Sequence, residues 1–147
     1  MTESLTDGVT LGIYEKALVG NRLATDDDWR RFLNQVPEAG FSFVDLSVDE
    51  SDERMARLGW EQNRRRMVRH CAEAAETVIG GVCLSVHRRI GPGSADPAVR
   101  QRARDVMAEG LRLCHDLGAP VLQVAGYYCY YEQMLSLIHI SEPTRPY

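Results

Sequence analysis

Residues 70–86 read "HCAEAAETVIGGVCLSV", a helix-like segment followed by glycine and a short apolar run. The same pattern recurs as "FLNQVPEAGFSFVDLSV" at residues 32–48 and as "GLRLCHDLGAPVLQVAG" at residues 110–126. The glycines at positions 40, 80 and 118 suit the residue after a helix end, where a positive φ turns the chain toward a strand. With "VTLGIYEK" (residues 9–16) as an opening strand, the repeat predicts four strands alternating with three helices.

The predicted helices carry their own start signals. Thr25 suits an N-cap, with Asp28 three residues later. The apolar face that follows consists of Trp29, Phe32, Leu33 and Val36. Asp96 and Pro97 suit the N-cap and first position of another helix. Its predicted buried stripe is Val99, Ala103, Val106, Gly110, Cys114 and Leu117. A third helix is predicted over residues 60–78, with Arg64, Arg65 and Arg66 on a solvated outer face.

Strict alternation of strands and helices predicts parallel strands joined by right-handed crossovers, which is an α/β fold. Both a doubly wound sheet and a (β/α)8 barrel are compatible with this pattern. No G-x-G-x-x-G motif follows the first strand, so the main sign of a dinucleotide-binding sheet is missing. Polar residues instead follow the strands, and in a barrel the C-terminal strand ends carry the active site.

Composition narrows the class of protein. The chain has 147 residues, 44% hydrophobic and 26% charged, which predicts one globular domain or part of one. Its formal net charge of -4 argues against a nucleic-acid partner. No apolar run is long enough to cross a membrane and no secretory signal is visible, so we expect no membrane partner and a cytoplasmic location. The four cysteines form no C-x-x-C pair, which favours reduced thiols.

Alternation within the third strand suggests a polar face. Cys83, Ser85 and His87 alternate with apolar residues, so we expect this polar set to face the mouth of a barrel. The same parity places Asp45 and Gln123 on the neighbouring strands of that face. The alternative is that Asp45 and Gln123 only fill a polar layer of the barrel interior by hydrogen bonding to each other.

Four segments carry a resemblance to a known family: "LGIYEKAL", "FSFVDLSVDESDERMARLGW", "CLSVHRRIGPGSADPAVR" and "VLQVAGYYCYYE". Together they resemble the L-ribulose-5-phosphate 3-epimerases, which belong to the xylose isomerase-like sugar phosphate isomerase and epimerase barrels. The resemblance covers about residues 9–133. It implies a (β/α)8 TIM barrel, of which this chain holds the first half, with about four strands and three helices.

The resemblance implies interconversion of L-xylulose 5-phosphate and L-ribulose 5-phosphate, by movement of the C3 proton through an enediolate. A divalent metal (Zn, Mn or Mg) would stabilise the developing negative charge, and two glutamates would act as acid and base. In the family, these ligands and glutamates lie on later strands. We therefore expect no catalytic residue, no metal ligand and no turnover in this chain itself, and a homodimer for the full-length enzyme.

The residues that the resemblance carries over have supporting roles in substrate binding. They are Tyr14, Asp45, Ser85, His87 and Arg88. Sugar or phosphate contacts are expected especially at the last three. A hexulose-6-phosphate or ketose isomerase of the same superfamily remains an alternative, because early strands constrain the scaffold more than the sugar. A non-catalytic interaction fragment is the alternative outside the enzymes.

The end of the chain departs from the repeat. Residues 135–147 read "LSLIHISEPTRPY", with prolines at 143 and 146 where a helix is due. The string resembles the conceptual translation of a sequencing adapter. We therefore assign residues 1–134 to the barrel domain, treat 135–147 as a non-native tail, and place neither His139 nor Glu142 in a site.

Overall fold

The computed structural model describes residues 9–18 and 23–124. Four strands form one sheet in the order β1-β2-β3-β4, and every neighbouring pair is parallel. The strands are β1 (Gly12–Tyr14), β2 (Phe43–Ser47), β3 (Val78–Cys83) and β4 (Val121–Gln123). Strand order equals chain order, which is the arrangement of consecutive barrel strands and confirms the predicted alternation.

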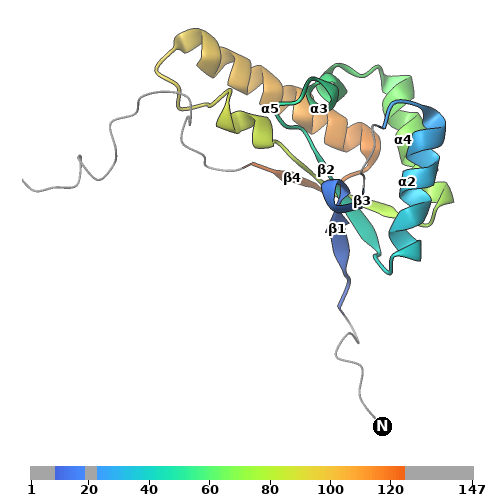
Figure 1. Ribbon diagram of the computed structural model, residues 1–147. Coiled ribbons are helices and arrows are strands. Elements are labelled where there is room, and N and C mark those ends of the chain that lie inside the picture. The colour runs from blue at the N-terminus through green and yellow to red at the C-terminus, as the bar shows by residue number, and fades with distance from the viewer. Residues whose placement is uncertain (1–8, 19–22, 125–147) are drawn as a thin grey trace, which may run out of the picture.

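The connections between strands contain three long helices and several short ones. The long helices are α2 (Asp26–Glu38), α4 (Gln62–Ala74) and α5 (Pro97–Leu117). The short helices are α1 (Glu15–Leu18), α3 (Asp52–Met55), and the 3₁₀ turns η1 (Ala56–Gly59) and η2 (Ser85–Arg88). The long helices pack beside one another and against the sheet, α2 on β2, α4 on β3, and α5 on β3 and β4 (Figure 1).

The predicted start signals of two helices are confirmed. Thr25 accepts a hydrogen bond from the Asp28 backbone, and the Asp28 carboxylate accepts from the Thr25 backbone at 2.8 Å, so both halves of a capping box are present. Asp96 caps α5 by accepting from Ala98 N at 2.8 Å, with Pro97 in the first turn. These local bonds satisfy backbone N–H groups that the first turn of a helix leaves free.

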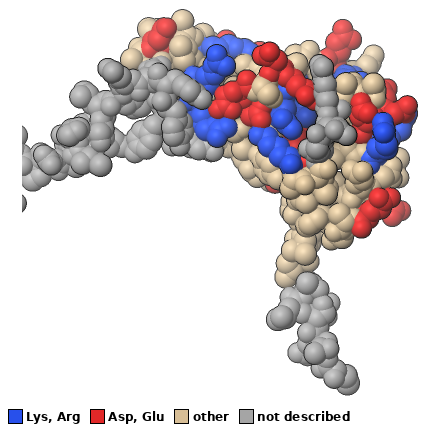
Figure 2. Space-filling view, in the orientation of Figure 1, with Lys and Arg blue, Asp and Glu red and all other residues tan. Residues whose placement is uncertain are grey.

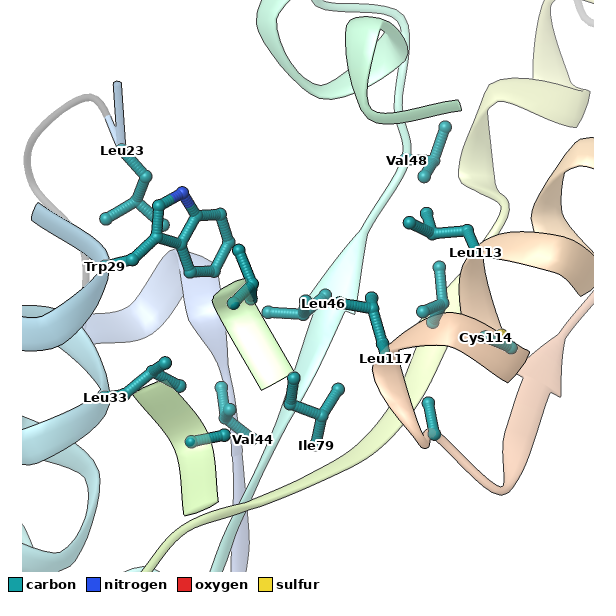
Figure 3. Close-up of a cluster of buried hydrophobic side chains, with 14 of the residues drawn as sticks. Leu23, Trp29, Leu33, Val44, Leu46, Val48, Ile79, Leu113, Cys114 and Leu117 are labelled. Atoms are coloured by element: carbon teal, nitrogen blue, oxygen red, sulfur yellow. The ribbon is translucent and has the colours of Figure 1, made fainter. Parts of the chain in front are cut away.

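Burial of one sheet face holds these layers together. Val44, Leu46 and Val82 of the sheet are at most 1% exposed and join a core with side chains of the helices. The close-up in Figure 3 shows Trp29 and Leu33 on one side of this core, and Leu113 and Leu117 on the other. All four predicted apolar residues of α2 are buried, and so is the α5 stripe apart from the half-buried Val99.

The structure corrects three details of the predicted elements. The predicted helix over residues 60–78 ends earlier, since α4 stops at Ala74 and residue 78 already begins β3. Gly40 and Gly118 have the expected positive φ, of 85° and 72°. Gly80 does not end a helix, because Glu76 takes the left-handed turn with φ 52°. Arg65 is buried, so the predicted solvated face of residues 64–66 is wrong at its centre.

Gly80 has a different role, as the extra residue of a bulge in β3. Val44 pairs with Ile79 and Asp45 with Gly81, so Gly80 has no opposite residue in β2. A Cβ at Gly80 would lie 2.5 Å from the Phe43 ring and 2.9 Å from Asp45 Oδ1. A Cβ at Gly12 of β1 would also collide with this ring. Glycines on both neighbouring strands therefore make room for Phe43 on the face of the sheet away from the helices.

We expect Gly80→Ala to lower the free energy of unfolding by about 1–3 kcal/mol, because the added methyl group must displace the Phe43 ring or the Asp45 carboxylate. Urea unfolding followed by circular dichroism measures the difference. Gly93→Ala is the matched control, since a Cβ there meets nothing within 4 Å, and it should change stability by less than about 0.5 kcal/mol. Equal losses in the two variants would contradict the role assigned to Gly80.

Candidate active site

The sheet face opposite the helices changes character along the strands. Its N-terminal part is apolar, with Phe43 across the centre and with Val78 and Val121 exposed at 56% and 48%. Toward the C-terminal ends the same face carries Tyr14, Asp45, Ser47, Cys83 and Gln123. The register places Tyr14 beside Asp45, and Cys83 beside both Ser47 and Gln123. This polar layer lies where barrel enzymes bind their substrates.

Asp45 and Gln123 are joined directly. Gln123 Nε2 donates to Asp45 Oδ2 at 3.2 Å, across the strand β3 that separates them. The bond is the one that the polar-layer alternative predicted. Burial raises the pKa of Asp45 above its ordinary value, and the Gln123 hydrogen bond only partly offsets this effect. Asp45 is half-buried, so it remains available to a ligand on the inner face of the sheet.

Tyr14 lies at the same level of the sheet, on the edge strand β1. Burial raises the pKa of its phenol, the neighbouring Cys83 thiol raises the pKa further, and the Ser47 hydroxyl acts in the opposite direction. The phenol is therefore neutral at physiological pH. A neutral phenol both donates and accepts hydrogen bonds, which suits a polyhydroxylated ligand.

Ser85 and His87 lie differently from the prediction. The strand ends at Cys83, and residues 85–88 form the turn η2, so strand alternation does not extend to either residue. His87 is 1% exposed, with Nε2 at 3.3 Å from the Ala103 carbonyl of α5. Burial lowers the pKa of its imidazole, which favours the neutral form. Ser85 Oγ donates to the Val48 carbonyl at 3.4 Å. The expectation that these side chains line the mouth with Cys83 is wrong, since both make backbone contacts inside the fold.

Two ion pairs connect the loops that follow β1, β2 and β3. Lys16 Nζ lies 2.5 Å from Asp49 Oδ2, and Arg88 Nη2 lies 3.0 Å from Glu50 Oε2. Asp49 also accepts from the backbone N of Ser51, at 2.9 Å. Asp49 and Glu50, adjacent residues after β2, thus bind basic side chains from the segments that follow β1 and β3. Lys16 and Arg88 side chains are 40% and 39% exposed, so the predicted substrate contact Arg88 stands at the rim of the candidate site.

Sequence reasoning missed a buried cluster next to this rim. Glu15 is 0% exposed and is contacted by Arg54 Nε and Arg57 Nη1, each at 2.6 Å. Arg57 is itself 2% exposed. The only local signal is the three-residue spacing of Arg54 and Arg57, which places them on one side of a helical turn. Their partner lies 39 and 42 positions away in the chain, beyond any local pattern.

A second buried arginine links α4 to α5. Arg65 Nη1 lies 3.1 Å from Asp116 Oδ2, and Arg65 Nη2 donates to the Leu58 carbonyl at 2.9 Å.

On the surface, acidic and basic side chains are intermixed over the helical part of the molecule, whereas the region around β1 is mostly uncharged (Figure 2). The face shown in Figure 2 therefore presents no charged surface of a single sign on the described helices.

A divalent metal does not fit the part of the chain that the structure describes. No three His, Cys, Asp or Glu side chains are grouped there as ligands. We therefore derive no chemical step through a metal from these residues.

Among the described helices, none combines the length and apolar character that a membrane span requires.

Comparison with known proteins identifies the class. The family described as Xylose isomerase-like TIM barrel matches residues 33–141. The chain therefore belongs to this family, as the parallel half-barrel arrangement of its sheet indicates. The crystal structure of D-psicose 3-epimerase in the presence of D-fructose superimposes with a TM-score of 0.59 at 16% identity, over 78% of this chain and 36% of that one. A Clostridium cellulolyticum D-psicose 3-epimerase with D-tagatose gives a TM-score of 0.58, again at 16% identity over 78% of this chain and 36% of that one.

Two curated relatives are closer in sequence. SgbU of Escherichia coli (strain K12), to which L-ribulose-5-phosphate 3-epimerase activity is provisionally assigned, is 48% identical over 124 residues, 83% of this chain and 41% of that protein. The L-ribulose-5-phosphate 3-epimerase UlaE of Salmonella heidelberg is 39% identical over 129 residues, 88% of this chain and 44% of that protein. The chain thus spans less than half the length of these relatives.

The ion pairs of Asp49 predict a pH dependence of stability. Burial opposes its ionisation, but hydrogen bonds from Lys16 and Ser51 outweigh burial and lower the pKa of Asp49 to about 2 from 3.8. A lowered pKa stabilises the folded state fully above the unfolded value, and this stabilisation is lost as the pH falls through the folded value. We expect Asp49→Asn to cost about 2 kcal/mol at neutral pH.

The measurement is the free energy of unfolding of both proteins from neutral pH down to about pH 2. The difference between wild type and Asp49→Asn should shrink as the pH falls from about 4 to about 2. A difference that stays constant over this range would show that the carboxylate charge contributes nothing. Asp27→Asn serves as control, since Asp27 pairs with Arg30 on the exposed surface of α2.

Proposed function

We propose that this chain is the first half of a sugar-phosphate 3-epimerase that interconverts L-ribulose 5-phosphate and L-xylulose 5-phosphate. The observation that carries the proposal is the 48% and 39% identity to relatives named for this activity, extending over most of the chain. The polar layer at the C-terminal strand ends supports it, because that layer presents hydrogen-bonding groups of the kind that a sugar requires.

In this proposal the described residues bind and orient the sugar. The neutral Tyr14 phenol donates to or accepts from a sugar hydroxyl, and the Asp45 carboxylate accepts from another while Gln123 holds it in place. Arg88, bound to Glu50 at the rim, supplies positive charge to the phosphate end. The predicted substrate-binding roles of Ser85 and His87 remain predictions, and their backbone contacts favour an indirect role in shaping η2.

The proton transfer itself is proposed to use groups outside the described residues. Inversion at C3 requires removal of a proton from one face of the sugar and delivery to the opposite face of the planar enediolate. That step conserves atoms and electrons and needs no external oxidant. The metal expected from the resemblance to the epimerases would likewise be held outside the described residues, where it would stabilise the charge on the enediolate oxygens.

A chimeric enzyme tests this proposal. Residues 9–124 of this chain replace the corresponding segment of the Salmonella UlaE epimerase, and epimerisation of L-ribulose 5-phosphate is assayed. We expect turnover by the chimera, and a loss of about 10-fold or more in kcat/KM on Tyr14→Phe, because a hydrogen bond to the sugar is removed. Arg30→Lys, on the exposed face of α2, is the control and should leave kcat/KM unchanged.

The substrate panel separates this proposal from the closest alternative. A chimera that turns over a hexulose 6-phosphate or an unphosphorylated ketose, and not the pentulose phosphates, would overturn the substrate assignment. A folded chimera inactive on all of them would count against an epimerase scaffold in this chain. The UlaE parent is assayed alongside, so that a failed assay is distinguished from a failed chimera.

A further inference from the structure

The buried carboxylate Glu15 directly follows Tyr14, and two guanidinium groups hold it. Arg54 Nε contacts Oε1 and Arg57 Nη1 contacts Oε2, both at 2.6 Å, so each carboxylate oxygen has its own cation. Charge-assisted bonds of this length are strong and strongly directional. Glu15 is 0% exposed, and its carboxylate cannot rotate without breaking one of these bonds.

Arg57 is fixed independently of Glu15. Its Nη1 also donates to the Ser47 carbonyl at 3.0 Å, which ties it to the end of β2. Its guanidinium lies over the rings of Trp29 and Trp60, at 5.3 and 5.9 Å from their centroids. Trp29 belongs to α2 and is fully buried, so Arg57 is held by the core of the fold. Through its bond to Glu15, Arg57 restricts the motion of the chain segment after β1.

Besides the Glu15 cluster, the Lys16–Asp49 ion pair holds the segment after β1, and the strand itself adds few backbone bonds. It contains three residues and, among the described strands, pairs with β2 alone. Short edge strands are held weakly by backbone bonds and open easily. Tyr14 is the last residue of this strand and pairs with Asp45 of β2, while the next residue, Glu15, is held by its two arginines. The direction of the Tyr14 side chain thus depends on an anchor one residue away.

We propose that Arg57, together with Arg54, is a positioning residue that acts through Glu15 to hold the Tyr14 phenol beside Asp45 in the polar layer. The inference rests on the proposed function in one respect, which is that Tyr14 faces the sugar. Neither arginine touches the ligand in this arrangement. Their effect on the reaction is to reduce the freedom of a group that does.

The phenol of Tyr14 provides a direct readout of its own placement. Burial is the main reason why the pKa of Tyr14 is raised, so a phenol released from the inner face would titrate closer to an exposed tyrosine. The chain is labelled with ¹³Cζ-tyrosine, the Tyr14 resonance is assigned by its disappearance in Tyr14→Phe, and an alkaline titration is recorded over the pH range in which circular dichroism shows each variant to be folded. We expect Arg57→Lys to shift the Tyr14 pKa downward, because lysine lacks the planar fork that binds Glu15 and stacks on both tryptophans.

Arg64→Lys is the matched control. Arg64 also lies over Trp60, at 5.6 Å, and also bonds a carboxylate and a carbonyl, Asp26 Oδ1 at 2.5 Å and Ala24 O at 2.8 Å. Among its described contacts, none is to Glu15. A general loosening of the helix layer would move the Tyr14 pKa in both variants, whereas positioning through Glu15 moves it only in Arg57→Lys.

If Arg57→Lys does not fold, as judged by circular dichroism, Arg54→Lys decides, since the Arg54 side chain is 23% exposed and tolerates change better. An unchanged Tyr14 pKa in the folded variant, or an equal shift in Arg64→Lys, overturns the inference. Because no substrate enters this titration, its outcome is independent of the proposed function. Full activity of the Tyr14→Phe chimera would refute the use of Tyr14 by the enzyme and leave the positioning result standing.

Discussion

The burial of Val44 and Leu46 under the helices determines where the groups of the candidate site lie. Because strand side chains alternate, placing these two residues in the core forces Phe43, Asp45 and Ser47 onto the opposite face. Parallel pairing without reversals then brings Tyr14 beside Asp45 and Cys83 beside Ser47 from the neighbouring strands. The polar layer is thus a geometric consequence of hydrophobic packing on the other side of a single sheet.

Unlike the hydrophobic core, the buried ion pairs contribute more to the orientation of side chains than to stability. Removing charges from water costs several kcal/mol per ion, so the Glu15 cluster is weak evidence for added stability. What it supplies is a fixed direction, since both carboxylate oxygens and the Ser47 carbonyl are bound at once. The cluster, the Asp49 and Glu50 pairs, and the Arg65 pair together hold the segments that leave the sheet.

Local chemistry explains which features the sequence predicted well. The capping box of Thr25, the Asp96 and Pro97 start, and the turns at Gly40 and Gly118 all depend on residues within one helical turn. Strand parity placed Asp45 and Gln123 on one face, and their hydrogen bond was one of the two alternatives left open there. These signals need no knowledge of distant partners, and they fixed the order of strands and helices.

The residues that the sequence placed wrongly depend on contacts outside their own local segment. Gly80 was misplaced because a non-glycine residue, Glu76, adopted the left-handed turn, which freed the glycine for a bulge beneath Phe43. His87 was misplaced because backbone pairing ends at Cys83 while the alternation of residue types continues. Arg65 was expected in solvent and Arg57 was assigned no role, because their carboxylate partners are 51 and 42 positions away. Each of these depends on contacts that only the folded chain creates.

Strand order that equals chain order has a consequence for biosynthesis. As the polypeptide leaves the ribosome, β2 emerges beside a β1 already made, and β3 and β4 each add to an existing edge. None of the four described strands has to be inserted between two others, so no pairing between them that forms early has to be undone. The growing sheet nevertheless exposes a fresh edge at every step. The short strands β1 and β4 limit the length of edge that can pair with a foreign chain.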